Sequence, residues 1–145
     1  MPDNRTIDTL LAQYSESHLN PTNEVIHFIC VPVIVFTLLG LLWAVHPLVA
    51  LAFTVAAMVY YFKLSKPFAL GMLLMASAML AILAALPPQA VLPLSVTVFV
   101  LAWIGQFIGH KIEGKKPSFF DDLRFLLIGP LFVLGFLYRR LHWAY

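Results

Sequence analysis

The run FALGMLLMASAMLAILAAL, residues 68–86, contains 19 residues without a charge. A segment of about 20 apolar residues is long enough to cross the hydrocarbon core of a bilayer as an α-helix. Three further runs of this kind cover residues 25–45, 48–62 and 91–108, and prolines mark the turns between them. The sequence therefore predicts an all-α, multi-pass integral membrane protein with about four transmembrane helices.

The overall composition excludes a soluble domain. Of the 145 residues, 61% are hydrophobic and 11% are charged, and the mean hydropathy is +0.90. Soluble domains average about 45–50% apolar and 25% charged residues. The net charge of +2 comes from basic residues beside apolar runs, which favours contact with anionic membrane lipids and argues against nucleic acid as a partner. The single cysteine, Cys30, excludes an intramolecular disulfide and a cysteine-based zinc site.

The two ends of the chain differ from the four spans. Residues 5–18 place apolar side chains at helical spacing and predict an amphipathic helix. Its apolar stripe consists of Ile7, Leu10, Leu11, Tyr14 and His18. The run 125–138 is too short to span comfortably and contains Gly129-Pro130, which predicts a re-entrant or interfacial helical hairpin. We interpret residues 1–145 as one membrane domain with an N-terminal amphipathic helix and loop (1–24), four spans (25–108), a polar loop (109–124) and a hairpin with a tail (125–145).

The basic residues predict the orientation of the chain. They gather in the loops 63–67 and 109–124 and in the tail, whereas the turns at 46–47 and 87–90 carry none. By the positive-inside rule, the N-terminus, the C-terminus and both basic loops lie in the cytoplasm. This orientation places His18, His27 and His110 on one face of the membrane and His46 on the other.

Two polar clusters interrupt the apolar sequence, and both contain histidines of the cytoplasmic face. His27 follows Asn23 and Glu24 by four and three residues, so the three share one helix face. His110 precedes Glu113 by three residues, at the end of the fourth span. Taken singly, each histidine is equally consistent with an interfacial residue that has a satisfied hydrogen bond or complements a helix dipole.

Taken together, His18, His27 and His110 suggest a metal site. Neutral imidazole is the commonest metal ligand, and histidines with a nearby carboxylate suit Fe(II), zinc or manganese. On one straight helix, residues nine apart at about 100° per residue would point in opposite directions. The helix break at Asn20-Pro21 is therefore needed for His18 and His27 to converge. The groups expected to orient the imidazoles are Asn20, Asn23, Glu24 and Gln106.

The order of these motifs resembles a known membrane family, and the resemblance covers nearly the whole chain. The matching residues are His18, Asn20, Pro21, Asn23, His27 and Pro32, followed after the spans by Gln106, Gly109, His110, Glu113, Gly114 and Pro117. The family includes the 2-hydroxy fatty acid dioxygenase of phytosphingosine breakdown and was long catalogued as a domain of unknown function.

The resemblance implies an Fe(II)-dependent dioxygenase, with Fe²⁺ as its cofactor. Such enzymes carry out α-oxidation, in which a long-chain 2-hydroxy fatty acid reacts with O₂, loses CO₂ and becomes one carbon shorter. It implies His18, His27 and His110 as metal ligands, with Glu113 as a further catalytic residue that is either a ligand or a supporting group. Lys111, Lys115 or Arg124 would attract the substrate carboxylate. The compact length suggests a bacterial-type member in the inner membrane.

Two other classes of function remain open at this point. The chain could be a small membrane transporter or a lipid-binding scaffold with structural histidines, which would carry no stoichiometric iron. It could also hold zinc and catalyse hydrolysis, which would consume no O₂. The sequence argues against the multi-histidine di-iron desaturases, because these need more histidines than the five of this chain, of which two lie far from the others. Substrate chain length and formation of a homo-oligomer are not determined by the sequence.

Overall fold

A computed structural model of the chain describes residues 6–15, 20–114 and 128–144. This part of the chain is α-helical and contains no β-strand. Its helices are α1 (Thr6–Ser15), α2 (Pro21–Val45), α3 (Pro47–Leu64), α4 (Lys66–Ala85), α5 (Pro88–Glu113) and α7 (Ile128–Arg140). The all-α prediction is confirmed.

Four of these helices, α2 to α5, are long and apolar enough to cross a membrane. They contain 18 to 26 residues, which corresponds to roughly 27–39 Å at 1.5 Å per residue and matches a hydrocarbon core of about 30 Å. Large apolar side chains such as Leu74 and Leu101 remain mostly exposed on their surfaces. Such surfaces are stable against lipid and not against water, so the four predicted spans are confirmed as features of a membrane protein.

Prolines and capping residues set the ends of the spans. Asn20 caps α2 and its side chain accepts hydrogen bonds from the N–H groups of Thr22 and Asn23, with Pro21 in the first turn. This confirms the predicted break at Asn20-Pro21. His46 ends α2 and caps α3, where its Nδ1 accepts the N–H of Leu48 at 3.1 Å. Chain reversal therefore requires only one residue between α2 and α3.

Several helices extend beyond the predicted apolar spans, and two of these extensions contain the polar clusters. Helix α2 begins at Pro21, as the Asn20-Pro21 pair predicts, four residues before the predicted span at residue 25. Helix α5 continues to Glu113, five residues beyond the predicted end at Ile108. The predicted polar loop 109–124 therefore begins as helix. Gly114 ends α5 because it adopts the left-handed conformation, with φ of 77°, which glycine adopts without strain. Hydropathy shows where lipid-facing residues end, whereas capping shows where a helix ends.

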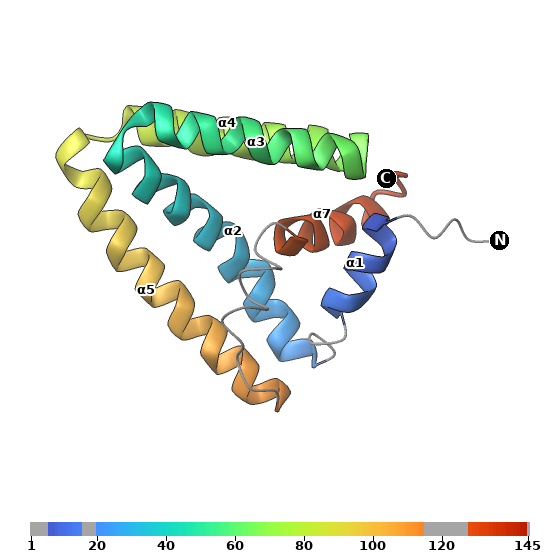
Figure 1. Cartoon of the computed structure of the whole chain (residues 1–145). Helices are drawn as coiled ribbons and strands as arrows, with labels where there is room; N and C mark the ends of the chain where they lie inside the picture. The colour runs from blue at the N-terminus through green and yellow to red at the C-terminus, as the bar shows by residue number, and fades with distance from the viewer. Residues whose placement is uncertain (1–5, 16–19, 115–127, 145) are drawn as a thin grey trace.

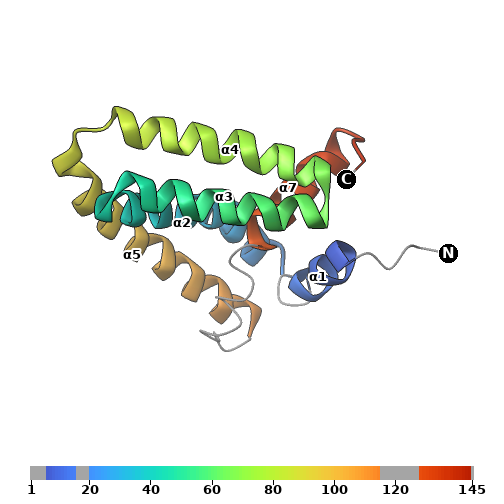
Figure 2. The same cartoon turned by 45° about the horizontal axis from the view of Figure 1, so that its top comes forward.

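The spans form two antiparallel pairs (Figure 1). Helix α2 packs most extensively against α5, and α3 packs against α4. The pairs meet at the end where α2 turns into α3 and α4 turns into α5, and α1 and α7 lie toward the opposite end (Figures 1 and 2). Helix α2 is central because it also contacts α3, α4 and α7.

The terminal helices close that opposite end with an apolar cluster. Ile7 and Leu11 of α1 are buried there, which confirms the predicted apolar stripe at these two positions. The side chain of Tyr14 and the whole of His18 lie outside the described residues. Leu131 and Phe132 of α7 belong to the same cluster, as does Phe68 of α4.

The predicted hairpin at residues 125–138 is described only from residue 128 onward. Gly129 and Pro130 lie in helix α7, which continues to Arg140, whereas residues 125–127 lie outside the described residues. Tyr138 then fixes α7 to α4: its hydroxyl donates to the carbonyl of Pro67 at 2.7 Å.

Candidate functional site

The two described histidines of the predicted metal site lie together. Residue 27 follows the start of α2 by six residues and residue 110 precedes the end of α5 by three, so the antiparallel packing of these helices brings them to the same end. The His27 and His110 side chains are 3% and 8% exposed. Their ring centres are 5.7 Å apart and the ring planes are nearly perpendicular, at 87°. His46 lies 19 residues after His27, about 28 Å along α2, at the other end of the spans.

The orientation of the His27 ring is fixed by its own helix. Its Nδ1 lies 2.9 Å from the backbone carbonyl oxygen of Asn23. A carbonyl can only accept a hydrogen bond, so Nδ1 carries the proton and, in the neutral ring, Nε2 carries the lone pair. A hydrogen bond from one ring nitrogen to a backbone carbonyl is the usual way in which a metal-binding histidine is held in the required tautomer.

Glu113 links the end of α5 to the start of α2. The backbone N–H of Asn20 donates to both carboxylate oxygens, at N···O distances of 2.9 and 3.2 Å. In a capping box, a glutamate of the same helix accepts the N–H of the capping residue; here the glutamate comes from another helix, 93 residues away. The positive end of the α2 dipole also favours this carboxylate. Glu113 therefore holds the two histidine-bearing helix ends together.

Gly109 allows α5 to approach α2 beside the imidazoles. A Cβ atom at this position would overlap with Oδ1 of Asn23 and lie 3.3 Å from Cε1 of His27. Asn23 is completely buried, so little room exists to relieve the overlap. Sequence reasoning did not assign Gly109 a role, although a glycine directly before the motif histidine, inside a helix, was the available signal.

The same close approach continues along the α2–α5 interface. A Cβ atom on Gly105 would lie 2.8 Å from Sγ of Cys30, and one on Gly40 of α2 would overlap with Ser95 of α5. Small residues on facing transmembrane helices let the backbones approach and gain dispersion contacts that lipid cannot provide. The position of the histidine pair thus follows from packing along the whole helix pair.

The remaining predicted site residues have different environments. Gln106 is 7% exposed, and within the described part of the chain its Oε1 has no hydrogen-bond partner. Glu24 is half-buried and Lys111 is exposed on the last turn of α5. His18, Lys115 and Arg124 lie outside the described residues. The buried amide of Gln106 is therefore the candidate among these for contact with a polar ligand.

The spacing of the two described imidazoles is compatible with both binding one metal ion. Two imidazoles that share one ion through bonds of about 2.1 Å have ring centres roughly 4.5–6 Å apart, and the observed 5.7 Å lies in this range. Over residues 6–15, 20–114 and 128–144, no group of three or more His, Cys, Asp or Glu residues gathers around one point. A site with three protein ligands needs one more, and His18, the predicted third, lies outside these ranges.

Comparison with known proteins identifies the family of the chain. A model of the family described as 2-hydroxy-palmitic acid dioxygenase Mpo1-like matches residues 4–141. The chain is 30% identical over 132 residues to the 2-hydroxy-palmitic acid dioxygenase MPO1 of Saccharomyces cerevisiae, and the match covers 86% of this chain and 75% of the yeast protein. No solved structure matches the chain. On the extent of these matches, the chain belongs to the Mpo1-like family of 2-hydroxy-palmitic acid dioxygenases.

Proposed function

We propose that the protein is an Fe(II)-dependent dioxygenase that removes one carbon from long-chain 2-hydroxy fatty acids. The observation that supports this most is the buried pair of His27 and His110, with the His27 tautomer fixed by the Asn23 carbonyl. The name of the yeast relative supplies the substrate class.

The reaction that we propose balances with O₂ as the only co-substrate. A 2-hydroxy acid, R–CH(OH)–COOH, and O₂ give R–COOH, CO₂ and H₂O. The bond between C1 and C2 breaks, C1 leaves as CO₂, and C2 becomes the carboxyl carbon of the shortened acid. The organic acid loses four electrons and O₂ accepts four, so no external reductant is required.

We assign the iron ligands to His18, His27 and His110. Bound iron would supply the redox chemistry with O₂ that amino acid side chains cannot. The chain's own residues hold the site: Asn23 fixes the His27 ring, and Glu113 joins the helix ends. The Gln106 amide, buried and one turn before His110, is suited to a hydrogen bond with the substrate 2-hydroxyl group.

The location of the site suits an amphiphilic substrate. The histidines lie near the ends of two spans, which is the depth where lipid headgroups begin, and an acyl chain anchored there extends into the hydrocarbon. Lys111 is exposed on the same turn as His110 and, with Lys115 and Arg124, would attract the carboxylate. By the positive-inside rule we place this end in the cytoplasm, as expected for a bacterial inner-membrane protein.

The decisive experiment combines metal analysis with turnover of 2-hydroxypalmitate by the purified protein. We expect stoichiometric iron, O₂ uptake and release of a 15-carbon acid, and we expect His110→Ala to lose both iron and turnover. His142→Ala is the matched control because this histidine is exposed. Stoichiometric zinc with no O₂ uptake would indicate a hydrolase instead. Unchanged iron and turnover in His110→Ala would refute the site assignment.

A further inference from the structure

The amide of Gln106 is buried beside the histidine pair, and its oxygen atom has no hydrogen-bond partner in the described part of the chain. The side chain is only 7% exposed. Nearly all buried polar groups in proteins are bound by another protein group, an ordered water or a ligand, because an unpaired one lowers stability. The Gln106 oxygen therefore indicates a place where a further molecule can bind.

The packing of α5 on α2 fixes the level of Gln106. Gly109 faces His27, because a Cβ atom there would lie 3.3 Å from Cε1 of that ring. Gly105, one turn deeper, faces Cys30, whose Sγ would lie 2.8 Å from an added Cβ. Gln106 lies between the two glycines in sequence and is rotated by about 60° from Gly109 around the helix axis. It therefore borders the same helix interface, in the layer beneath the His27 ring.

His110 leans over Gln106 on α5. It follows Gln106 by four residues, which corresponds to about 6 Å along the helix and 40° around it. Side chains in a helix lean toward its N-terminus, so the ring at position 110 is directed toward the residue four positions earlier. The two imidazole centres are 5.7 Å apart. A ligand bound at His27 and His110 would thus have the Gln106 amide as its neighbour on the hydrocarbon side.

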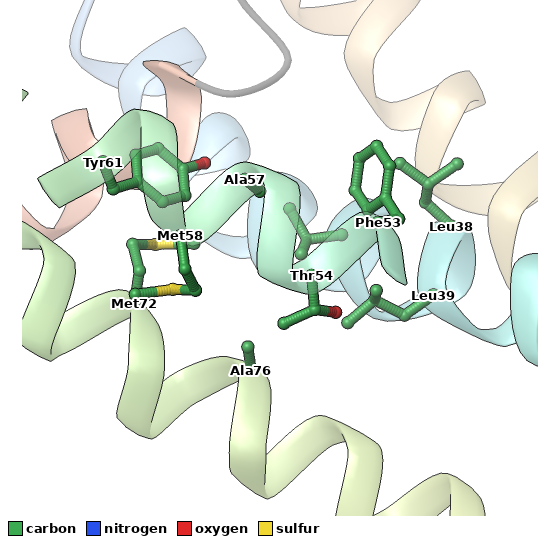
Figure 3. A pocket seen from close by; sticks show the side chains of 10 residues that line it. Leu38, Leu39, Phe53, Thr54, Ala57, Met58, Tyr61, Met72 and Ala76 are labelled. Atoms are coloured by element: carbon green, nitrogen blue, oxygen red, sulfur yellow. The ribbon is translucent and has the colours of Figure 1, made fainter. Parts of the chain in front are cut away.

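A second candidate in the bundle lacks this feature. A small space between α2, α3 and α4 has mostly apolar walls, and Figure 3 shows Met58 and Met72 side by side in it. The Thr54 hydroxyl at its wall already donates to the carbonyl of Ala50 at 2.8 Å. Gln106, in contrast, offers a buried oxygen that is still open to a ligand.

The chemistry of this oxygen defines what it can recognise. Oε1 of Gln106 is a carbonyl oxygen, which accepts hydrogen bonds and cannot donate them. The ionised carboxylate of a 2-hydroxy acid also only accepts, whereas its 2-hydroxyl group can donate. The hydroxyl group therefore fits this side of the site and the carboxylate does not.

We propose that Gln106 is the specificity-determining residue of the site and selects acids whose C2 substituent can donate a hydrogen bond. This proposal rests on the proposed function, because it takes the substrate head group to bind at His27 and His110. A 2-hydroxy acid would pair with Oε1, whereas a 2-oxo, 2-methoxy or unsubstituted fatty acid would leave that atom unpaired. Sites that hydrogen-bond a substrate hydroxyl reject analogues without it by up to about 10⁴–10⁵-fold. One buried amide is therefore sufficient to exclude ordinary fatty acids.

The substitution Gln106→Met tests this selection, because methionine has a similar length but only a weakly accepting sulfur. The measurement is anaerobic binding to the iron-loaded protein, so that no turnover occurs. The probes are 2-hydroxypalmitate and 2-methoxypalmitate, which keeps the C2 oxygen but cannot donate. For the wild type we expect the methoxy acid to bind at least tenfold more weakly. For Gln106→Met the two dissociation constants should lie within threefold of each other.

Gln89→Met is the matched control, since Gln89 is exposed in the first turn of the same helix. It should keep the preference of the wild type for the hydroxy acid. A wild type without this preference, or a Gln106→Met variant that retains it, would overturn the assignment of Gln106.

Thermal unfolding of the iron-loaded protein without fatty acid separates recognition from a structural role. We expect Gln106→Met to be at least as stable as the wild type, because an apolar side chain replaces an amide whose oxygen is buried without a partner. An unfolding temperature lowered by more than about 4 °C would instead assign Gln106 to the packing of α2 and α5 and overturn the proposal. Loss of the preference in Gln106→Met, found in a protein that takes up no O₂ with 2-hydroxypalmitate, would retain the recognition role and refute the proposed reaction. O₂ uptake with an unchanged preference would refute only the role of Gln106.

Discussion

The substitution Gly109→Ala is the most direct test of how the bundle positions its histidines. The added methyl carbon would overlap with Oδ1 of Asn23 and contact Cε1 of His27 at 3.3 Å. Asn23 is completely buried, so α5 must move away from α2. Overpacking of this kind costs about 1–3 kcal/mol, and a displacement of about 1 Å at reacting groups can reduce the rate roughly 100-fold. We therefore expect kcat/KM for 2-hydroxypalmitate to fall at least tenfold, with weaker retention of iron.

The control for this prediction is Gly105→Ala, one turn earlier on α5. There the nearest neighbour is a single atom, Sγ of Cys30, at 2.8 Å, and adding Cys30→Ala removes it. We expect Gly105→Ala to lower the thermal unfolding temperature in detergent and Cys30→Ala to restore part of the loss, with iron binding retained in both. The close-approach argument would be refuted if Gly109→Ala kept its iron content and turnover within twofold of the wild type and its unfolding temperature within about 2 °C of it.

Three further predictions concern separate parts of the molecule. Glu113→Gln keeps an acceptor for the Asn20 N–H but loses the charge. We expect this change to lower the free energy of unfolding by about 1 kcal/mol, and Glu113→Ala to lower it further. Equal stability of the two variants would contradict the linking role of Glu113. Chelation should abolish O₂ uptake, with recovery on addition of Fe(II) but not Zn(II). Tyr138→Phe removes the bond to Pro67 and should cost about 1 kcal/mol without changing turnover. Burial raises the pKa of Tyr138, so this contribution should be complete below the unfolded pKa of about 10 and disappear as the pH rises through the higher folded value.

The architecture could be predicted well from sequence because the spans differ so strongly from the turns. Uninterrupted apolar runs located α2 to α5, and the Asn20-Pro21 pair located the start of α2. The positions of the basic residues indicated that His27 and His110 lie at the same end, and the structure brings their rings to 5.7 Å. These features depend on local composition, which a single sequence contains.

The contacts that complete the site could not be predicted in the same way. The bond between Glu113 and the Asn20 N–H joins residues 93 positions apart, and the role of Gly109 depends on which side chain faces it across the interface. The predicted end of the fourth span at Ile108 was too early because a hydropathy pattern does not distinguish a polar helical turn from a loop.

The site lies at the ends of α2 and α5 for a physical reason. Polar groups in the hydrocarbon core have no water to bind, so each must find a partner within the protein. Helix ends provide such partners, because their terminal N–H groups are unsatisfied by the helix itself. The Asn20 N–H, at the start of α2, binds Glu113 in this way and joins the two helix ends beside the imidazoles. Imidazoles two turns deeper would lie about 11 Å farther from these helix ends. In an apolar bundle that acts on the polar end of a lipid, a site at the ends of the spans therefore leaves the fewest polar groups without a hydrogen-bond partner.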